Sequence, residues 1–127
     1  MSDQTPPGAV SIPAALDQIH EHFQPHRLAS VNDHDVKIAK IQGEFIWHAH
    51  PDSDELFLVT SGELTIQLRD REVALRPLEV FVVPAGVEHR PVTPVGVETV
   101  IVMVEKKGTR NTGDAGGDRT VQVKELG

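Results

Sequence analysis

The sequence between residues 36 and 105 is a series of short apolar and β-branched runs separated by turn residues, and this pattern constrains the fold more than any other feature. Runs of this composition, bounded by turns, are typical of strands. No helical pattern interrupts the series, so consecutive strands connect through tight turns, which predicts an all-β fold built as an antiparallel barrel or jelly roll. The predicted strands are VKIAKIQ, EFIWHAH, ELFLVT, ELTIQL, EVALR, EVFVVP, HRPVT and ETVIVMVE.

Two segments flank the predicted barrel. Before it, Ser11 is a suitable N-cap and Pro13 lies in the first turn of an amphipathic helix that ends before Pro25. After it, residues 108–127 are rich in glycine and polar residues, which predicts an irregular tail with a short strand at 120–123. The chain of 127 residues is therefore one domain, with a helix and arm at 1–34, a barrel at 35–107 and a tail at 108–127. The apolar helix positions are Ile12, Leu16, Ile19 and Phe23.

Composition excludes several classes of site and partner. The chain has no cysteine, so disulfides, thiolate metal sites and thiol nucleophiles are ruled out. Its 19 acidic residues outnumber its 12 basic ones, which disfavours binding to nucleic acid or to anionic membranes. The N-terminus lacks the pattern of a signal peptide, and no apolar stretch is long enough to span a bilayer. We therefore expect a cytoplasmic protein.

The most specific chemical signal is a set of histidines and carboxylates. His48 and His50 are one residue apart, so on an extended strand they project from the same side and can reach one ion. Glu55 follows on the next predicted strand, and His89 comes directly after a Pro-x-Gly turn. Imidazole nitrogens and one carboxylate oxygen suit a divalent transition metal (Fe, Mn, Co, Ni, Cu or Zn) better than Ca or Mg.

These residues stand in two motifs. The first runs from Gly43 through His-x-His and Glu to Gly62, and the second is Pro-x-Gly-x-x-His in VPAGVEH. With the segment KKGTRNTGD after the barrel, the chain resembles a small single-domain cupin of the kind labelled as similar to mannose-6-phosphate isomerase. It departs from the family pattern in three places: the spacing from Gly43 to His48 is one residue shorter, Leu78 replaces a glycine, and Thr93 replaces an asparagine. The matching positions are Gly43, His48, His50, Glu55, Gly62, Pro84, Gly86 and His89.

The resemblance implies a cupin double-stranded β-helix, a jelly-roll barrel with a metal near one mouth. It further implies that the metal ligands are His48, His50, Glu55 and His89, and that the chain forms a homodimer. A metal-dependent enzyme of dioxygenase or isomerase type acting on a small oxygen-containing metabolite is the first function hypothesis. In it, Glu55 is the candidate general base and Glu44 the reserve candidate. The alternative is a non-catalytic module that binds a metal or metabolite.

Strand alternation also predicts the inner wall of the barrel. Phe57 and Val59 share a face with Glu55, and Val87 and Thr93 share one with His89, which gives a mostly apolar pocket for a small-molecule ligand. No cluster of Arg or Lys is predicted to point inward, so a phosphorylated sugar is disfavoured.

Residues on the other face are predicted to lie outside the barrel. Phe45 and Trp47 face away from the two histidines if the strand is regular, and the helix or a second subunit then covers them. The remaining histidines have no carboxylate at ligand spacing and are predicted to lie on the surface. They are His20, His22, His26 and His34.

Overall fold

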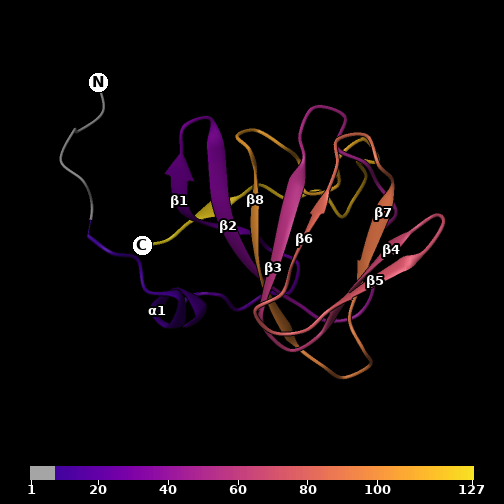
Figure 1. The fold of residues 1–127 in the computed structure, drawn as a ribbon. Helices are drawn as coiled ribbons and strands as arrows, with labels where there is room; N and C mark the ends of the chain where they lie inside the picture. The colour runs from indigo at the N-terminus through magenta and orange to yellow at the C-terminus, as the bar shows by residue number, and fades with distance from the viewer. Residues whose placement is uncertain (1–7) are drawn as a thin grey trace.

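The computed structural model describes residues 8–127 and confirms the all-β jelly-roll fold (Figure 1). Nine strands form two sheets, one with the order β6-β3-β8-β2-β1-β9 and one with the order β5-β4-β7. Residues 1–7 of the predicted arm lie outside the described part of the chain. The elements are α1 (Ile12–Leu16), β1 (His26–Val31), β2 (His34–Ile41), β3 (Glu55–Ser61), β4 (Leu64–Leu68), β5 (Glu72–Leu75), β6 (Val80–Val83), β7 (His89–Val92), β8 (Thr99–Lys106) and β9 (Lys124–Glu125).

The two sheets face each other across the main hydrophobic core. Strand β8 lies between β2 and β3 although it is far from both in sequence, and all strand pairs except the parallel pair β1–β9 are antiparallel. Every second side chain of these strands points between the sheets, because successive residues of a strand face opposite sides. The core residues are Ala39, Ile41, Phe57, Val59, Leu64, Ile66, Leu75, Val83, Ile101 and Met103.

A second apolar cluster covers the outer face of the larger sheet. Ile38, Val100 and Val102 face outward and pack against the segment that contains α1 and Ile19. Figure 1 shows α1 beside one end of this sheet. At five residues, α1 is the one helix among residues 8–127, and it is too short to cross a membrane.

The predicted helix is correct in position and too long. Ser11 caps it as expected, because its Oγ accepts a hydrogen bond from the backbone N–H of Ala14 at 3.2 Å. The helix ends at Leu16, and Phe23 has φ +59°, which a helix does not allow. The helical spacing of the later apolar residues arises from a turn that still buries Ile19.

Three strand predictions need correction. Residues 44–50 form no continuous strand and make only isolated bridges, from Glu44 to Val92 and from His48 to His89. The segment HRLASV, which the pattern did not mark, forms β1. The tail has its strand at Lys124–Glu125 rather than at 120–123. The rest of the tail consists of turns and irregular structure, as predicted.

Two turns use positive φ. Gly62 has φ +84°, and a Cβ there would lie 2.5 Å from Thr99 Oγ1, so only glycine fits. Leu78 occupies the position where the family pattern has glycine, and it adopts φ +69° with its side chain exposed. The turn conformation is therefore kept although the residue differs.

Candidate metal centre

The first residues of two strands and one irregular segment bring four side chains together inside the barrel. Glu55 is the first residue of β3, and His89 is the first residue of β7. The backbone of His48 pairs with that of His89 through two hydrogen bonds, of 3.1 and 2.9 Å, which hold the His-x-His segment against β7. We call the group formed by His48, His50, Glu55 and His89 the His–Glu cluster.

The donor atoms of the His–Glu cluster converge. One candidate ligand atom from each residue lies within 4.8 Å of the others, and all four residues are buried. Oε1 of Glu55 is 3.1 Å from Nε2 of His50 and 3.2 Å from Nε2 of His89. The rings of His48 and His89 have their centroids 4.3 Å apart. Three imidazoles and one carboxylate thus surround a common point.

Backbone contacts fix the orientation of two imidazoles. Nδ1 of His48 donates to the carbonyl oxygen of Ile46 at 2.8 Å, and Nδ1 of His89 donates to that of Val87 at 3.0 Å. A carbonyl can only accept, so each ring carries a proton on Nδ1 and turns Nε2 toward the cluster, where Nε2 of His89 is hydrogen-bonded to Oε1 of Glu55 at 3.2 Å. This is the arrangement that metal-ligating histidines commonly have.

His50 supplies the test of whether the cluster fits a metal. Both of its ring nitrogens are buried, and neither has a hydrogen-bond partner among residues 8–127. Although Nε2 lies 3.1 Å from the Glu55 carboxylate, the contact does not have hydrogen-bond geometry. An unsatisfied buried nitrogen is costly, and a cation between the two groups would remove that cost. The residues present therefore fit a divalent metal.

The charge states of the cluster also suit a cation. Burial would raise the pKa of Glu55, but contacts with His50 and His89 outweigh it and hold this pKa well below its usual range. Burial, together with the neighbouring His89, lowers the pKa of His48 to about 4. At neutral pH the cluster thus offers a carboxylate and a neutral His48 imidazole, which are the forms that bind metals.

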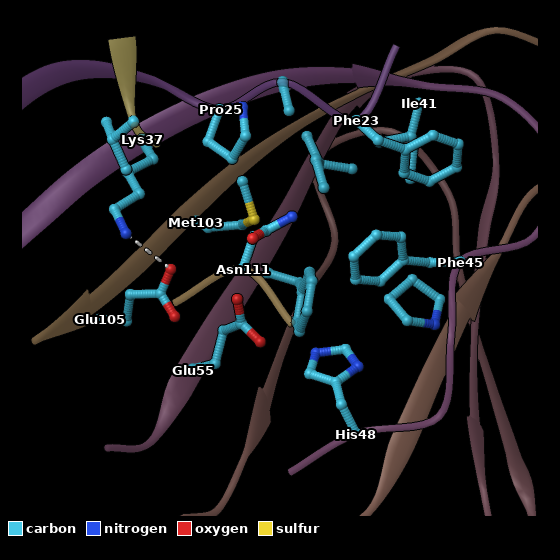
Figure 2. A pocket seen from close by; sticks show the side chains of 15 residues that line it. Phe23, Pro25, Lys37, Ile41, Phe45, His48, Glu55, Met103, Glu105 and Asn111 are labelled. Carbon is cyan, nitrogen blue, oxygen red and sulfur yellow. Dashed lines mark hydrogen bonds and ion pairs between the residues drawn. The ribbon is translucent and has the colours of Figure 1, made fainter. Parts of the chain in front are cut away.

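A cavity opens beside the cluster (Figure 2). It encloses about 50 Å³, several times the roughly 10–15 Å³ that one water molecule needs. His48 and Glu55 lie at one side, and most of the remaining wall is apolar. The apolar wall is Phe23, Pro25, Ala39, Ile41, Phe45, Phe57, Pro91, Ile101, Met103 and Val123.

The sequence analysis missed two charged residues in this cavity. Lys37 and Glu105 are almost fully buried, and Nζ of Lys37 donates to Oε2 of Glu105 at 3.1 Å. Burial and then the negative charge of Glu55 raise the pKa of Glu105 to about 9, while Lys37 acts in the opposite direction. Lys37 shares its strand face with the core residues Ala39 and Ile41, and this face of β2 is the inner one.

The structure also sets one candidate residue apart from the cluster and corrects the placement of two others. Glu44 is exposed, lies 3.5 Å from Arg90 in an ion pair and does not join the cluster. Phe45 is buried, lines the cavity and stacks on Phe23 at a centroid distance of 5.3 Å, because residues 44–50 do not alternate as a regular strand does. His26 is buried rather than on the surface, with Nδ1 3.1 Å from the carbonyl oxygen of Gln24.

Of the residues predicted to line the pocket, Phe57 does so, whereas Val59, Val87 and Thr93 are not part of the cavity wall. Phe57 and Val59 are buried in the core, and Val87 packs against it. Trp47 lies outside, where the Arg69 guanidinium is 3.8 Å from its ring centroid. Thr93, which stands where the family has asparagine, accepts a hydrogen bond from the backbone N–H of Gly43 at 2.7 Å.

The irregular tail supports the His-x-His segment directly. The backbone N–H of Ala49 donates to Oδ1 of Asp114 at 2.8 Å, and the N–H of Asp114 donates to the carbonyl oxygen of Ala49 at 2.9 Å. This reciprocal pair, which we call the Asp114 clamp, fixes the residue between His48 and His50. Further along the tail, the guanidinium of Arg119 lies about 5 Å from the ring centroids of Phe23 and Phe45.

Comparisons with known proteins agree with the fold and the motif. A family model described as Cupin domain matches residues 34–105. Over 95 residues the chain is 42% identical to the Bacillus subtilis (strain 168) protein named "Uncharacterized protein YdbB", an alignment covering 74% of this chain and 82% of that protein.

Two crystal structures resemble the chain in three dimensions. A cupin-2 domain containing protein from Shewanella frigidimarina NCIMB 400 has a TM-score of 0.74 and 36% identity, with 77% of this chain and 94% of that chain covered. Protein NMB1881 from Neisseria meningitidis has a TM-score of 0.70 and 25% identity, with 79% and 100% covered.

Proposed function

Because the chain belongs to the cupin domain family, we propose that the His–Glu cluster binds one divalent transition metal and that the protein acts on a small oxygen-containing metabolite bound directly to this metal. The observation that carries the proposal is the unpartnered, buried imidazole of His50 beside the carboxylate of Glu55. Two such groups are stable side by side in a protein interior when a cation lies between them.

The cavity defines what the metabolite must be like. A divalent ion with three neutral imidazoles and one carboxylate leaves a surplus of one positive charge, so a ligand with one anionic oxygen, such as a carboxylate or an enolate, would neutralise it. The apolar wall and the small volume favour a compact compound with few polar groups.

The metal would polarise the bound oxygen as a Lewis acid. The chain's own residues orient the ligand: the Nδ1 contacts of His48 and His89 hold the rings, and the phenyl groups of Phe45 and Phe57 supply an apolar wall beside it. Glu55, with its low pKa, is a better ligand than a proton acceptor at neutral pH. We propose an isomerase or a dioxygenase as the reaction class.

Metal binding is tested with the metal-free protein and Co²⁺. We expect about one Co²⁺ per chain for the wild type. In His50→Ala the affinity should fall by more than about 100-fold, because even the loss of a group that only supports a ligand costs roughly 10–100-fold. His20→Ala is the matched control, since His20 is exposed and far from the cluster. Isothermal titration calorimetry measures both, and unchanged affinity in His50→Ala would refute the ligand assignment.

The reaction class is tested by metal analysis of protein purified without added metal, followed by oxygen-electrode assays with enolic and hydroxycarbonyl compounds. Oxygen uptake that depends on Fe, Mn, Ni or Cu supports dioxygenation. A protein that holds only zinc excludes it, since zinc is redox-inert, and leaves isomerisation.

A further inference from the structure

Lys37 and Glu105 form a polar end to a cavity whose wall is otherwise mostly apolar. Figure 2 shows their hydrogen bond and both carboxyl groups, of Glu105 and Glu55, directed into the cavity. Lys37 also donates to the carbonyl oxygen of Thr109 at 3.4 Å. Two ionisable side chains held in a protein interior are expensive to bury, and an apolar pair of similar volume would be as stable or more so. Their presence therefore calls for a role beyond packing.

The sheet register explains why Glu105 lies beside the cluster. Leu56 on β3 pairs with Val104 on β8, so the next opposing positions along the two antiparallel strands are Glu55 and Glu105. Residues directly opposite on one face have their Cβ atoms about 4.5–5.5 Å apart. A ligand bound at Glu55 is thus within reach of Glu105.

Among the polar residues that line the cavity outside the His–Glu cluster, Glu105 is the one with a buried oxygen that has no hydrogen-bond partner within residues 8–127. The amide of Asn111 is held by the tail, because it donates to the carbonyl oxygen of Arg119 at 2.9 Å and accepts from the N–H of Val121 at 3.0 Å. Lys37 is directed to Glu105 and Thr109. Oε1 of Glu105 is buried and has no hydrogen-bond partner within the described residues.

We propose that Glu105, held in place by Lys37, is a second recognition point that selects small ligands carrying a hydroxyl group in addition to the carboxylate or enolate oxygen that binds the metal. A hydroxyl both donates and accepts, so it satisfies Oε1 whether or not the Glu105 carboxyl is protonated. The substrate class is then a small hydroxylated acid or carbonyl compound with an apolar body against the phenylalanine wall. This inference rests on the proposed function, because the metal holds the other end of the ligand.

The test uses Co²⁺-loaded full-length protein and two probes, 3-hydroxybutyrate and butyrate, which differ by one hydroxyl group. The visible spectrum of Co²⁺ reports carboxylate binding without any need for turnover. We expect the wild type to bind 3-hydroxybutyrate roughly 10-fold more tightly or better, as one hydrogen bond to a buried carboxyl group provides. The double variant Lys37→Met/Glu105→Leu removes the pair without leaving a buried charge, and it should lose this preference while retaining Co²⁺.

Each outcome decides one of the two proposals. Three results would overturn the role of Glu105 and leave metal binding standing. They are equal affinity of the two probes in the wild type, no binding of either probe, and a preference for 3-hydroxybutyrate that persists in the double variant. Failure of the wild type to hold Co²⁺ overturns the proposed function and this inference with it.

A second variant covers the case in which the double variant does not fold. Lys37→Met/Glu105→Met uses an unbranched, flexible side chain at both positions, removes both oxygens of Glu105 and leaves no buried charge. The ratio of the two affinities should fall to about one, and an unchanged ratio overturns the proposal. Circular dichroism establishes that each variant is folded.

Discussion

At the scale of single residues, the site depends on protonation states that burial controls. His48 is buried, and its pKa is lowered to about 4 from an ordinary value of 6.5, so the imidazole is neutral in the folded chain at physiological pH. Its Nδ1–H is committed to the carbonyl oxygen of Ile46, which leaves Nε2 for the metal. Metal binding at this residue consequently requires no loss of a proton at neutral pH.

This shift predicts a pH dependence of stability in the metal-free protein. Between pH 6.5 and about 4 the unfolded chain protonates His48 and the folded chain does not, so the free energy of unfolding falls as the pH falls through this window. The free energy of unfolding has fallen by roughly 3 kcal/mol once the pH is below both the unfolded and the folded pKa of His48. Glu105, whose pKa is raised to about 9, contributes in the opposite direction from about pH 4.5 to 9, because the folded chain keeps its proton there.

A difference measurement separates the two contributions. The free energy of unfolding is measured in urea for the metal-free wild type and for His48→Gln, each at pH 7, 5.5 and 4. The difference between the two proteins cancels the Glu105 contribution, which both share. The wild type should lose more stability than the variant on acidification. Parallel pH profiles would show that His48 titrates normally in the folded chain.

At the scale of elements, the alternation of side chains along regular strands predicted their positions well, and the irregular segments were predicted poorly. The sequence predicted the strands with clear turn boundaries, and it placed Phe57 and Val59 on the inner face correctly. It missed β1, whose run HRLASV is half polar and whose residues 29–31 are all exposed, so the run lacks the alternation that marks a strand. It extended the helix past Leu16, since apolar residues at helical spacing also occur in the turn that follows.

The candidate site was predicted from its motifs, and the polar pair beside it was not. Four residues with family spacing were sufficient to name the His–Glu cluster, whose donors lie within 4.8 Å of one another. Lys37 lies in a run, VKIAKI, that is apolar on both faces, so the run does not reveal which face is inside. Its partner Glu105 is 68 positions away, and no local pattern links the two residues. The burial of Phe45 depends on the irregular backbone of residues 44–50.

The Asp114 clamp gives a prediction at this scale. A Cβ on Gly113 would lie 2.2 Å from the carbonyl oxygen of Ala49, so the tail and the His-x-His segment approach closely only with glycine there. Gly113→Ala should lower the free energy of unfolding by about 3 kcal/mol or more, the sum of a left-handed backbone conformation and an overpacked contact.

Gly116→Ala is the matched control for this variant. Gly116 has φ +62°, similar to the +55° of Gly113, and its nearest neighbours are the flexible end of Arg110 at 4.0 Å. Only the backbone cost of about 1 kcal/mol should remain. Chemical denaturation measures both variants, and equal losses would mean that the tail moves aside freely.

At the scale of the whole molecule, the outer face of the larger sheet is only partly covered. Beyond the region under α1, Val80 and Val82 on β6 are exposed, and so is Leu78 just before this strand. In the described sheet β6 pairs only with β3, so its other edge has unpaired backbone groups. An apolar face at a free edge is typical of an interaction surface.

We therefore predict a homodimer that pairs through β6. Light scattering after size-exclusion chromatography should give twice the chain mass for the wild type. Val80→Lys/Val82→Lys should shift the protein toward monomer, because two buried charges would face each other across the interface. Val95→Lys is the control, since Val95 is fully exposed on the β7–β8 connection. A monomeric wild type would contradict the prediction.

The position of the tail in the chain has a consequence for the order of folding. Asn111 and Val123 complete the cavity wall, β9 joins the sheet beside β1, and the Asp114 clamp secures the segment that carries two of the candidate ligands. All of these lie after β8 in the sequence. The other strands of the two sheets can therefore pair before the tail docks, and the finished cavity exists only once the tail has packed against them.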